Sequence, residues 1–161
     1  GLDVGIRIGE LADSSLNAVA VGTVVRVICA SPDYVARAGA PQKPTDLPEH
    51  STILANGLNA SSEWKFANTS VHIRPRLRFA TNDAALEAAL AGFGITRLLS
   101  YQVAPYIADG RLVPLLQEEQ QTRLPIHIVY REGRYASAKI RTFVDLMAAR
   151  LRADSALNPP G

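Results

Sequence analysis

Short apolar runs of strand length alternate along this chain with segments that carry a helical pattern, and this alternation restricts the possible folds more than any other feature. The run from Thr23 to Ala30 is almost continuously apolar and rich in β-branched residues, as in a strand that is buried on both faces. Residues 137–151 instead repeat apolar side chains at the spacing of an amphipathic helix. Strands that alternate with helices are typical of the α/β class, so we expect an α/β fold with a largely parallel sheet.

Glycine, proline and capping residues divide the rest of the chain. Ser31 and Pro32 form a favoured helix start, and Gly39 is a favoured helix end. Asn82 and Ser100 each stand between a strand pattern and a helix pattern, and we expect both to be N-caps. Further strands are expected at residues 2–9, 19–21, 52–55, 63–67, 70–74, 76–81, 94–99, 112–116 and 125–130, with a break at Gly22 and a frayed polar tail at 154–161.

The composition argues against several kinds of site. Seventeen lysines and arginines against fifteen acidic residues leave a formal charge of +2, too small an excess to indicate nucleic-acid binding by this chain. The single cysteine, Cys29, permits neither an internal disulfide nor a cluster of thiolate metal ligands. The histidines, at positions 50, 72 and 127, lack the spacing of metal ligands. We therefore expect no metal site and no cofactor.

The sequence carries no apolar run of membrane-spanning length and no signal-peptide pattern. Together with the lone cysteine, these features fit a reducing cytosol, so we expect a cytoplasmic protein with no membrane partner. The motifs of nucleophile elbows, phosphate-binding loops and helical zinc sites are also missing from the sequence. We expect a binding protein rather than an enzyme.

Several phrases of the chain, by their order and spacing, resemble the effector-binding domain of LysR-type transcriptional regulators, and the resemblance extends to about residue 152. The phrases are LDVGIRIG at 2–9, DSSL at 13–16, VICASPDYVA at 27–36, TNDAAL at 81–86, ALAGFGI at 89–95, DGRLVPLL at 109–116 and PIHIVY at 125–130. Two positions depart from the family pattern. Family members often have a proline where this chain has Leu99-Ser100, and Arg97 stands in a strand that is usually apolar.

The resemblance implies a two-lobed type 2 periplasmic-binding-protein-like fold, in which two α/β lobes are joined by two crossing strands and a ligand binds in the cleft. It places the crossings near residues 22–23 and 122–124. Residues 1–22 and 124–161 would then form regulatory subdomain I, which is partial, and residues 23–123 regulatory subdomain II. The family's helix-turn-helix segment, its linker helix and the first elements of subdomain I would lie upstream, so we expect one lobe to be incomplete.

Five residues are candidates for contact with an effector. A ligand in such a cleft is usually held by helix N-termini, a few hydroxyls and amides, and one charged group. Asn56, Asn82 and Ser100 each follow a predicted strand, where the crevice of an open α/β sheet lies. Arg7, near the end of the first strand, could bind a carboxylate through both guanidinium nitrogens, and Ser14 lies in a polar turn.

Each candidate also has a purely structural interpretation. Asn82 and Ser100 would stabilise helices as caps, and Ser14 would be a turn residue. Arg7 would form a surface ion pair with Asp3 or Glu10. Among other notable residues, Trp64 and Phe66 are interpreted as packing or lid residues, and Cys29 as a small buried hydrophobe rather than a redox sensor.

The leading functional hypothesis is an effector-sensing domain that controls transcription through the missing helix-turn-helix domain. An arginine together with amides favours an organic anion as the small-molecule effector. Promoter DNA would be a partner only through the absent N-terminal domain. The full-length protein would be a homo-oligomer, a dimer or a tetramer, with the helix at 83–91 as a candidate surface between subunits. The alternative from another class is the solute-binding protein of a transporter, and an enzyme on the same scaffold ranks last.

Overall fold

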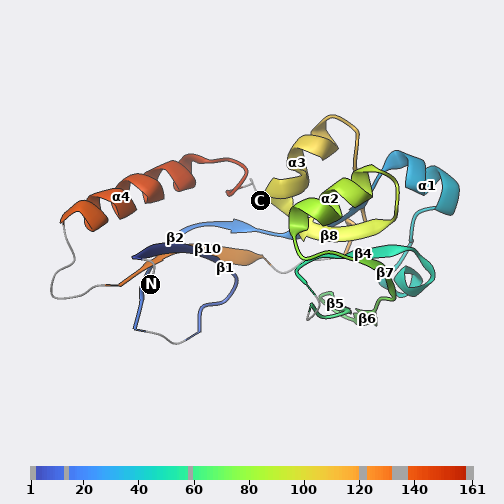
Figure 1. Cartoon of the computed structure of the whole chain (residues 1–161), viewed down its shortest axis with the longest axis horizontal. Coiled ribbons are helices and arrows are strands. Elements are labelled where there is room, and N and C mark those ends of the chain that lie inside the picture. The colour runs from blue at the N-terminus through green and yellow to red at the C-terminus, as the bar shows by residue number, and fades with distance from the viewer. Residues whose placement is uncertain (1–2, 13–14, 58–59, 120–122, 132–137, 159–161) are drawn as a thin grey trace. The chain divides into compact units, whose positions relative to one another are not determined.

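The computed structural model describes residues 3–12, 15–57, 60–119, 123–131 and 138–158. The chain divides into two compact units: unit 1 is Gly1–Val25 with Arg123–Gly161, and unit 2 is Arg26–Thr122. Helices and strands occur in both units, which confirms the α/β class (Figure 1). The sequence placed the crossings near residues 22–23 and 122–124, and the observed division falls after residues 25 and 122. The assignment of the two units to regulatory subdomains stays a prediction.

Unit 1 is a three-stranded sheet with one helix on it. Helix α4 (Ala138–Ala153) packs on strand β2 and lies along one face of the sheet (Figure 1). The strands, in spatial order, are β1 (Val4–Ile8), β10 (Leu124–Tyr130) and β2 (Asn17–Val24). The buried residues of this unit are apolar, as expected for a helix-on-sheet core: Val21, Val24, Ile126, Ile128, Val129, Val144 and Ala148.

Unit 1 leaves large apolar side chains exposed on its edge strand and on its helix. Ile6 on the edge strand β1 is 52% exposed, and Leu146 on α4 is 53% exposed. Ile8 and Phe143 are exposed as well. Several exposed large apolar side chains in so small a unit are typical of surfaces that another element covers.

Gly22 lies inside β2 and does not end a strand, so the expected break at this residue is wrong. A Cβ atom at position 22 would lie 2.4 Å from the carbonyl oxygen of Leu157. The same oxygen accepts a hydrogen bond from the Thr23 amide at 2.8 Å. Glycine therefore lets the end of the chain lie directly on the strand, and the strand pattern ends only after Val24.

The segment after α4 is held in place up to residue 158, contrary to the expected fraying from residue 154. The Asn158 side-chain amide lies within hydrogen-bonding distance of the Val21 carbonyl on β2, at 3.4 Å, and of three carbonyls at the end of α4 and beyond it, each at 3.2 Å. The composition of this tail is that of a frayed terminus, but its asparagine satisfies carbonyls that the helix end leaves open. The last three residues lie outside the described part of the chain.

Unit 2 is built on a five-stranded sheet with a reversed strand. Strand β4 is parallel to both its neighbours, and β3 is antiparallel to both of its own, so β3 alone runs opposite to the other four. The strands, in spatial order, are β7 (Pro75–Arg78), β4 (Thr52–Leu54), β8 (Ile95–Leu99), β3 (Arg26–Ala30) and β9 (Val113–Leu115).

The expectation of a largely parallel sheet is met only in part by unit 2, where two strand pairs are parallel and two are antiparallel, and it is wrong for unit 1. In unit 1, β10 lies between β1 and β2 and is antiparallel to both. In each unit the reversed strand is the one that directly follows a crossing: β3 follows the crossing at residue 25, and β10 the crossing at residue 122. A strand that arrives from another unit is not fed by a helical crossover, so the alternation of elements carries no information about its direction.

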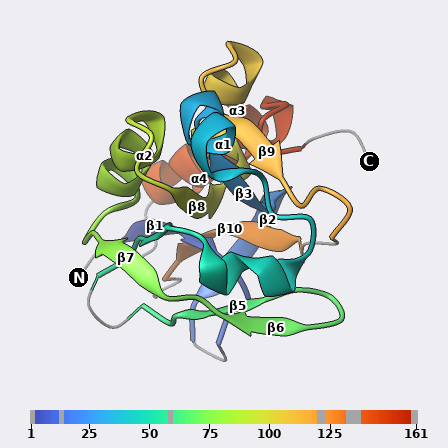
Figure 2. The ribbon, with the colours of Figure 1, turned by 90° about the vertical axis from the view of Figure 1, so that its right-hand side faces the viewer.

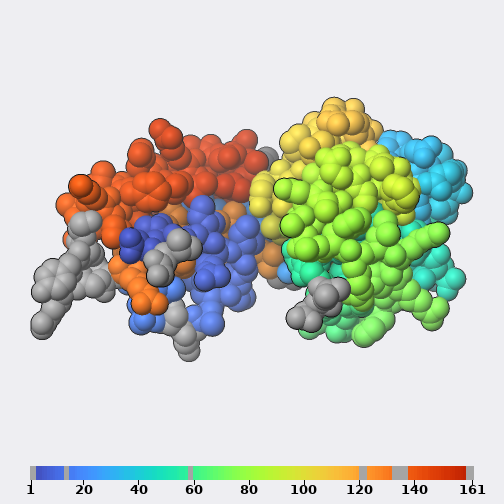
Figure 3. Space-filling view, in the orientation of Figure 1, coloured from blue at the N-terminus to red at the C-terminus, as the bar shows by residue number. Residues whose placement is uncertain are grey.

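The two faces of the unit 2 sheet carry separate cores. Helices α2 (Asn82–Leu90) and α3 (Ser100–Ala108) cover one face, where Ala85, Ala89 and Val103 pack with Cys29 and Leu98. The opposite face is covered by the β5–β6 hairpin and the short 3-10 helix η1 (Figure 2), and Tyr34 of helix α1 joins the core on that face. These elements are β5 (Glu63–Lys65), β6 (Ser70–His72), η1 (Pro44–Glu49) and α1 (Pro32–Ala38). In the space-filling view α2 and α3 form a continuous surface of unit 2 (Figure 3).

The expected start and end of α1 are confirmed. Ser31 is the N-cap, and its Oγ accepts a hydrogen bond from the Tyr34 amide at 3.1 Å. Pro32 is the first helical residue, and Gly39, with φ 78°, is the C-cap. Each of these roles depends only on neighbours in the sequence, which explains why the sequence predicts them well.

The N-cap roles expected for Asn82 and Ser100 are wrong by one residue. Thr81 caps α2, because its Oγ1 accepts a hydrogen bond from the Ala84 amide at 3.2 Å, and Asn82 is already helical. Leu99 occupies the cap position of α3, and its amide donates to Oε1 of Gln102 at 3.2 Å. Consecutive polar residues such as Thr81 and Asn82 are both suited to a cap, so the sequence alone does not choose between them.

Replacing Thr81 with alanine is expected to lower the free energy of unfolding by about 1 kcal/mol, because the first turn of α2 loses a side-chain cap. Urea denaturation of the variant measures this loss. The matched change is Asn82→Ala, which leaves the cap in place and removes one hydrogen bond, from Nδ2 to Gln102. A larger loss for Asn82→Ala than for Thr81→Ala would contradict the observed cap.

Candidate functional site

Three of the candidate residues lie at the same end of the unit 2 sheet. Strands β4, β7 and β8 run in the same direction, so their carboxyl ends meet at one edge. Asn56 follows β4, Asn82 follows β7 and Ser100 follows β8. In open α/β sheets the ligand crevice lies outside the carboxyl ends of the strands. The topology thus brings these residues to the edge where the sequence expected them, and their contact with an effector stays a prediction.

Asn56 borders a hollow in unit 2, which we call the Arg97 hollow. Asn56 has φ 73° and is followed by Gly57 with φ 85°, a left-handed turn that asparagine and glycine tolerate better than other residues. The Gly57 amide donates to the Phe79 carbonyl at 3.0 Å, which fixes the turn against the end of β7. The hollow has a volume of about 260 Å³, and its polar lining residues are Arg26, Asn56, Ser61, Glu63 and Arg97.

Arg97 is the unusual residue of this hollow, because it emerges from the middle of the sheet. It lies on β8, which has β4 on one side and β3 on the other, and it is half-buried. Its guanidinium carbon lies 5.0 Å from the centre of the Trp64 ring, a cation–π contact. Burial lowers the pKa of Arg97 to about 10, with a further contribution from the positive charge of Arg26. Arg97 stays protonated near neutral pH, but its charge is poorly compensated.

No carboxylate of the described residues forms an ion pair with Arg26 or Arg97. The described ion pairs join Arg37 to Asp33 and Arg111 to Asp109, both elsewhere on unit 2. Glu63 lines the hollow, but its Oε1 accepts a hydrogen bond from Ser70 Oγ at 2.5 Å. That bond holds the pKa of Glu63 below its ordinary value, with smaller contributions from the charges of Lys65 and His72.

The floor of the hollow is a packing residue, as the sequence suggested. Trp64 is 1% exposed and belongs to the core under the β5–β6 hairpin, together with Phe66. The packing interpretation of both aromatic residues is confirmed. A side chain so deeply buried cannot stack on a ligand, so the indole acts by supporting Arg97 from below.

Asn82 connects the starts of two helices. Its Nδ2 donates to Oε1 of Gln102 at 3.2 Å, and the same oxygen accepts from the Leu99 amide. The Oδ1 atom of Asn82 is buried and has no hydrogen-bond partner within the described part of the chain. Ser100 is the first residue of α3 and is half-buried. Asn82 therefore joins α2 to α3, a structural role that its sequence position did not reveal.

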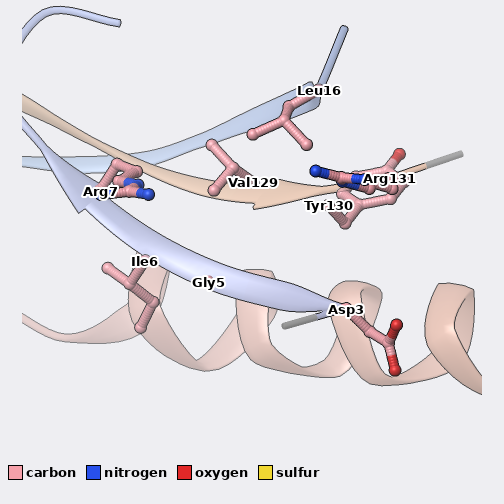
Figure 4. A pocket seen from close by; sticks show the side chains of 8 residues that line it. All are labelled: Asp3, Gly5, Ile6, Arg7, Leu16, Val129, Tyr130 and Arg131. Carbon is pink, nitrogen blue, oxygen red and sulfur yellow. The ribbon is translucent and has the colours of Figure 1, made fainter. Parts of the chain in front are cut away.

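Arg7 lies on strand β1 of unit 1. It is exposed on β1 and borders two open hollows beside Leu16 and Val129, on the side of the strand opposite to Ile6 (Figure 4). Within the described residues it forms no ion pair with Asp3 or Glu10. The clamp interpretation of Arg7 thus stays a prediction. Ser14 lies outside the described residues.

Sequence reasoning missed Arg26 and Arg97 as candidates. Arg97 was noted only as a charged residue in a strand that is usually apolar, and that departure was the available signal. Arg26 was passed over because it falls inside the run from Thr23 to Ala30, which the sequence predicted as one buried strand, whereas β3 begins at Arg26. Their proximity depends on the reversed direction of β3, which brings its amino end to the carboxyl end of β8, where Arg26 pairs with Leu99.

The described residues hold no group of three or more histidine, cysteine, aspartate or glutamate side chains arranged to bind a metal ion. Within the same residues, no helix has the length and apolar character needed to span a membrane. Cys29 is fully buried in β3, as the interpretation of a small hydrophobe requires.

Cys29 is expected to resist alkylation in the folded protein. Burial raises the pKa of its thiol from 9.0 to about 12, so at pH 8 the reactive thiolate is almost absent. The folded protein holds the thiol proton more tightly than the unfolded chain does. The stability that the burial of this thiol contributes is therefore fully present below pH 9 and is lost as the pH rises from 9 towards 12. Iodoacetamide labelling followed by mass spectrometry compares the labelling rate of Cys29 in buffer with its rate in about 8 M urea, which unfolds a small domain. Equal labelling rates in both solutions would disprove the burial.

Comparison with known proteins gives one consistent result. The family model described as "LysR substrate binding domain" matches residues 1–152. Among curated proteins, the HTH-type transcriptional regulator YcaN of Escherichia coli K12 is 32% identical over 148 residues, which are 90% of this chain and 49% of that protein. The HTH-type transcriptional activator AaeR of the same strain is 33% identical over 150 residues, 90% of this chain and 48% of that protein. The chain thus spans about half the length of these relatives.

Solved structures agree with the sequence relatives. The regulatory domain of CrgA, a LysR-type transcriptional regulator from Neisseria meningitidis, aligns with a TM-score of 0.78 and 29% identity, covering 93% of this chain and 76% of that one. Full-length AphB, the Vibrio cholerae virulence activator, aligns with a TM-score of 0.80 and 26% identity, covering 91% of this chain and 51% of that one. The fold found here therefore occurs in the regulatory part of longer transcriptional regulators.

Proposed function

The chain belongs to the LysR substrate-binding domain family, the effector-binding domain of LysR-type transcriptional regulators, and we propose that it senses a small organic anion and controls transcription through a helix-turn-helix domain of the same protein. The family match over residues 1–152 is the observation that carries this proposal. It confirms the family resemblance of the sequence. The relatives are transcriptional regulators, so the alternative of a transporter's solute-binding protein has no support among them.

We propose as effector contacts the residues that the sequence indicated. In unit 2 these are Asn56, Asn82 and Ser100, at the carboxyl edge of the sheet, and in unit 1 they are Arg7 and Ser14. Polar groups at helix starts together with an arginine suit a carboxylate, which is why we propose an organic anion. We propose binding without turnover, because the relatives found by comparison are transcriptional regulators.

We propose that unit 1 is part of a larger lobe, regulatory subdomain I, and that unit 2 is regulatory subdomain II. The exposed Ile6, Ile8, Phe143 and Leu146 support this assignment, because further elements of a larger lobe would cover them. The effector would act by binding two arrangements of the lobes with different affinity, since only that difference shifts their populations. The site would thereby influence DNA binding by the whole protein.

The whole protein is proposed to be a cytoplasmic homo-oligomer, a dimer or a tetramer, whose contact with promoter DNA is made by its helix-turn-helix domains. Helix α2 is proposed as a surface between subunits. No membrane partner is proposed.

The test uses the full-length protein and the promoter region next to its gene. Fluorescence anisotropy measures promoter affinity with and without each member of a panel of small organic acids, and calorimetry measures binding of the same acids. We expect one class of acid to bind and to change promoter affinity by about 5-fold or more, the usual range of coupling between sites. If no acid binds and none alters promoter affinity, the sensing function is wrong.

A further inference from the structure

The Arg97 hollow joins two guanidinium groups to a short apolar wall. Arg26 and Arg97 lie on its positive side. Its apolar lining includes Ile53, Leu54, Ala55 and Ala60, at the end of β4 and in the turn that follows. Every lining residue belongs to unit 2, so the hollow is complete without any contribution from unit 1.

The arginine at position 97 is costly for the fold unless it binds something. A half-buried cation in a central strand loses hydration, and this loss is normally compensated by a carboxylate or by several good hydrogen bonds. Arg97 has the Trp64 ring below it and a weak hydrogen bond, at 3.5 Å, from Nη1 to the Lys65 carbonyl. Arg26 adds a second positive charge instead of a negative one. A leucine or methionine would cover the indole equally well, so packing does not explain the charge.

The surroundings strengthen the positive field at this edge. Lys65 and Arg78 are exposed nearby, and Arg78 donates to Ser62 Oγ at 3.0 Å beside the hollow. The carboxylate of Glu63 is directed to Ser70, where it accepts its short hydrogen bond. The carboxylate of Glu63 thus lines the hollow but forms no ion pair with Arg26 or Arg97 within the described residues.

We propose that the Arg97 hollow is an anion subsite for a small organic carboxylate with a compact apolar body, and that Arg97, assisted by Arg26, sets this specificity. The proposal rests on the sensing function above and names the chemical class of its ligand. The planar guanidinium of Arg97 would bind both carboxylate oxygens, and the wall formed by residues 53–55 would contact the apolar body. A volume of about 260 Å³ has room for a ring of six carbons with one carboxylate.

The chain contains its own reporter for this test. Trp64 is the single tryptophan, and it lies directly under Arg97, so its emission responds to a change of charge in the hollow. The probes are cyclohexanecarboxylate, the uncharged cyclohexanecarboxamide of the same shape, and inorganic phosphate. We expect the carboxylate to bind at least about tenfold more tightly than the amide or phosphate, and to bind less tightly as salt is added.

Three Arg→Met variants locate the binding. Arg97→Met is expected to abolish the preference for carboxylate over amide, and Arg26→Met to reduce it about threefold or more. Arg76→Met, an exposed arginine on β7, is the matched control and should leave the preference unchanged. Circular dichroism checks that each variant is folded. If Arg97→Met fails to fold, Arg26→Met decides, because Arg26 is exposed at the start of its strand.

Three results would overturn the subsite: equal affinity of the wild-type chain for carboxylate and amide, phosphate binding as tight as the carboxylate, or a preference that survives in Arg97→Met. These outcomes are separate from failure of the sensing function. If a carboxylate binds through Arg97 but does not change the affinity of the full-length protein for its promoter, the sensing function is refuted and the subsite stands. A promoter response to an effector that Arg97→Met does not weaken refutes the subsite and leaves the function.

Discussion

Replacing Gly94 with alanine is expected to lower the free energy of unfolding of unit 2 by about 3–5 kcal/mol, one of the largest effects of any single substitution in the chain. Gly94 has φ 154°, and a Cβ atom there would lie 2.4 Å from the Ser51 carbonyl oxygen and 2.9 Å from its carbonyl carbon. These are backbone atoms that cannot rotate away. The Ser51 oxygen also accepts the Ile95 amide at 2.9 Å, so moving it would break the start of the parallel pair β4–β8.

Urea denaturation followed by Trp64 emission measures this loss, because the single tryptophan reports on unit 2. The control is Gly110→Ala. Gly110 has a positive φ of 80°, but no atom lies within 4 Å of a Cβ placed there. Its replacement should lower stability by about 1–2 kcal/mol, the usual cost of a left-handed alanine. Equal losses for the two variants would show that the close approach to Ser51 is not what requires glycine at position 94.

Replacing Trp64 with alanine is expected to lower stability by about 3–5 kcal/mol. The indole is 1% exposed and fills the core between the sheet and the β5–β6 hairpin, where its removal leaves a large cavity. The substitution also removes the cation–π contact between the indole and Arg97. Circular dichroism during urea denaturation measures the loss, since this variant has no tryptophan emission. Phe93→Ala is the control: Phe93 is 59% exposed, and its removal should change stability by about 0.5 kcal/mol or less. Similar losses for both aromatic residues would contradict the observed core.

Local features of the fold were predictable, and long-range ones were not. The start of α1 at Ser31-Pro32 and its end at Gly39 follow from residues within a few positions of each other. The amphipathic stripe of α4 is equally local, although its Phe143 is exposed. By contrast, the reversed direction of β3 and β10 depends on where the chain re-enters each unit, and Gly22 is explained only by Leu157, far along the chain.

The candidate site divides in the same way. Asn56, Asn82 and Ser100 were placed at one sheet edge because strand ends can be recognised from the sequence. The Arg97 hollow was missed because Arg26 and Arg97 meet only through antiparallel pairing of β3 with β8. Asn82 was proposed as an effector contact, but its side-chain amide donates a hydrogen bond to Gln102. Gln102 lies on a different helix, and no local pattern reveals this partner. Resemblance to a family predicted a crevice at this edge, but the charges there depend on this chain's own residues.

The contact of residues 157 and 158 with β2 has a practical consequence for anyone who labels or purifies this protein. An affinity tag or fluorescent protein joined immediately after Asn158 would strain the hydrogen bond between Leu157 and Thr23, close to Val25, where the first segment of unit 1 ends. A flexible spacer between Asn158 and the fusion would leave the contact between the tail and β2 intact.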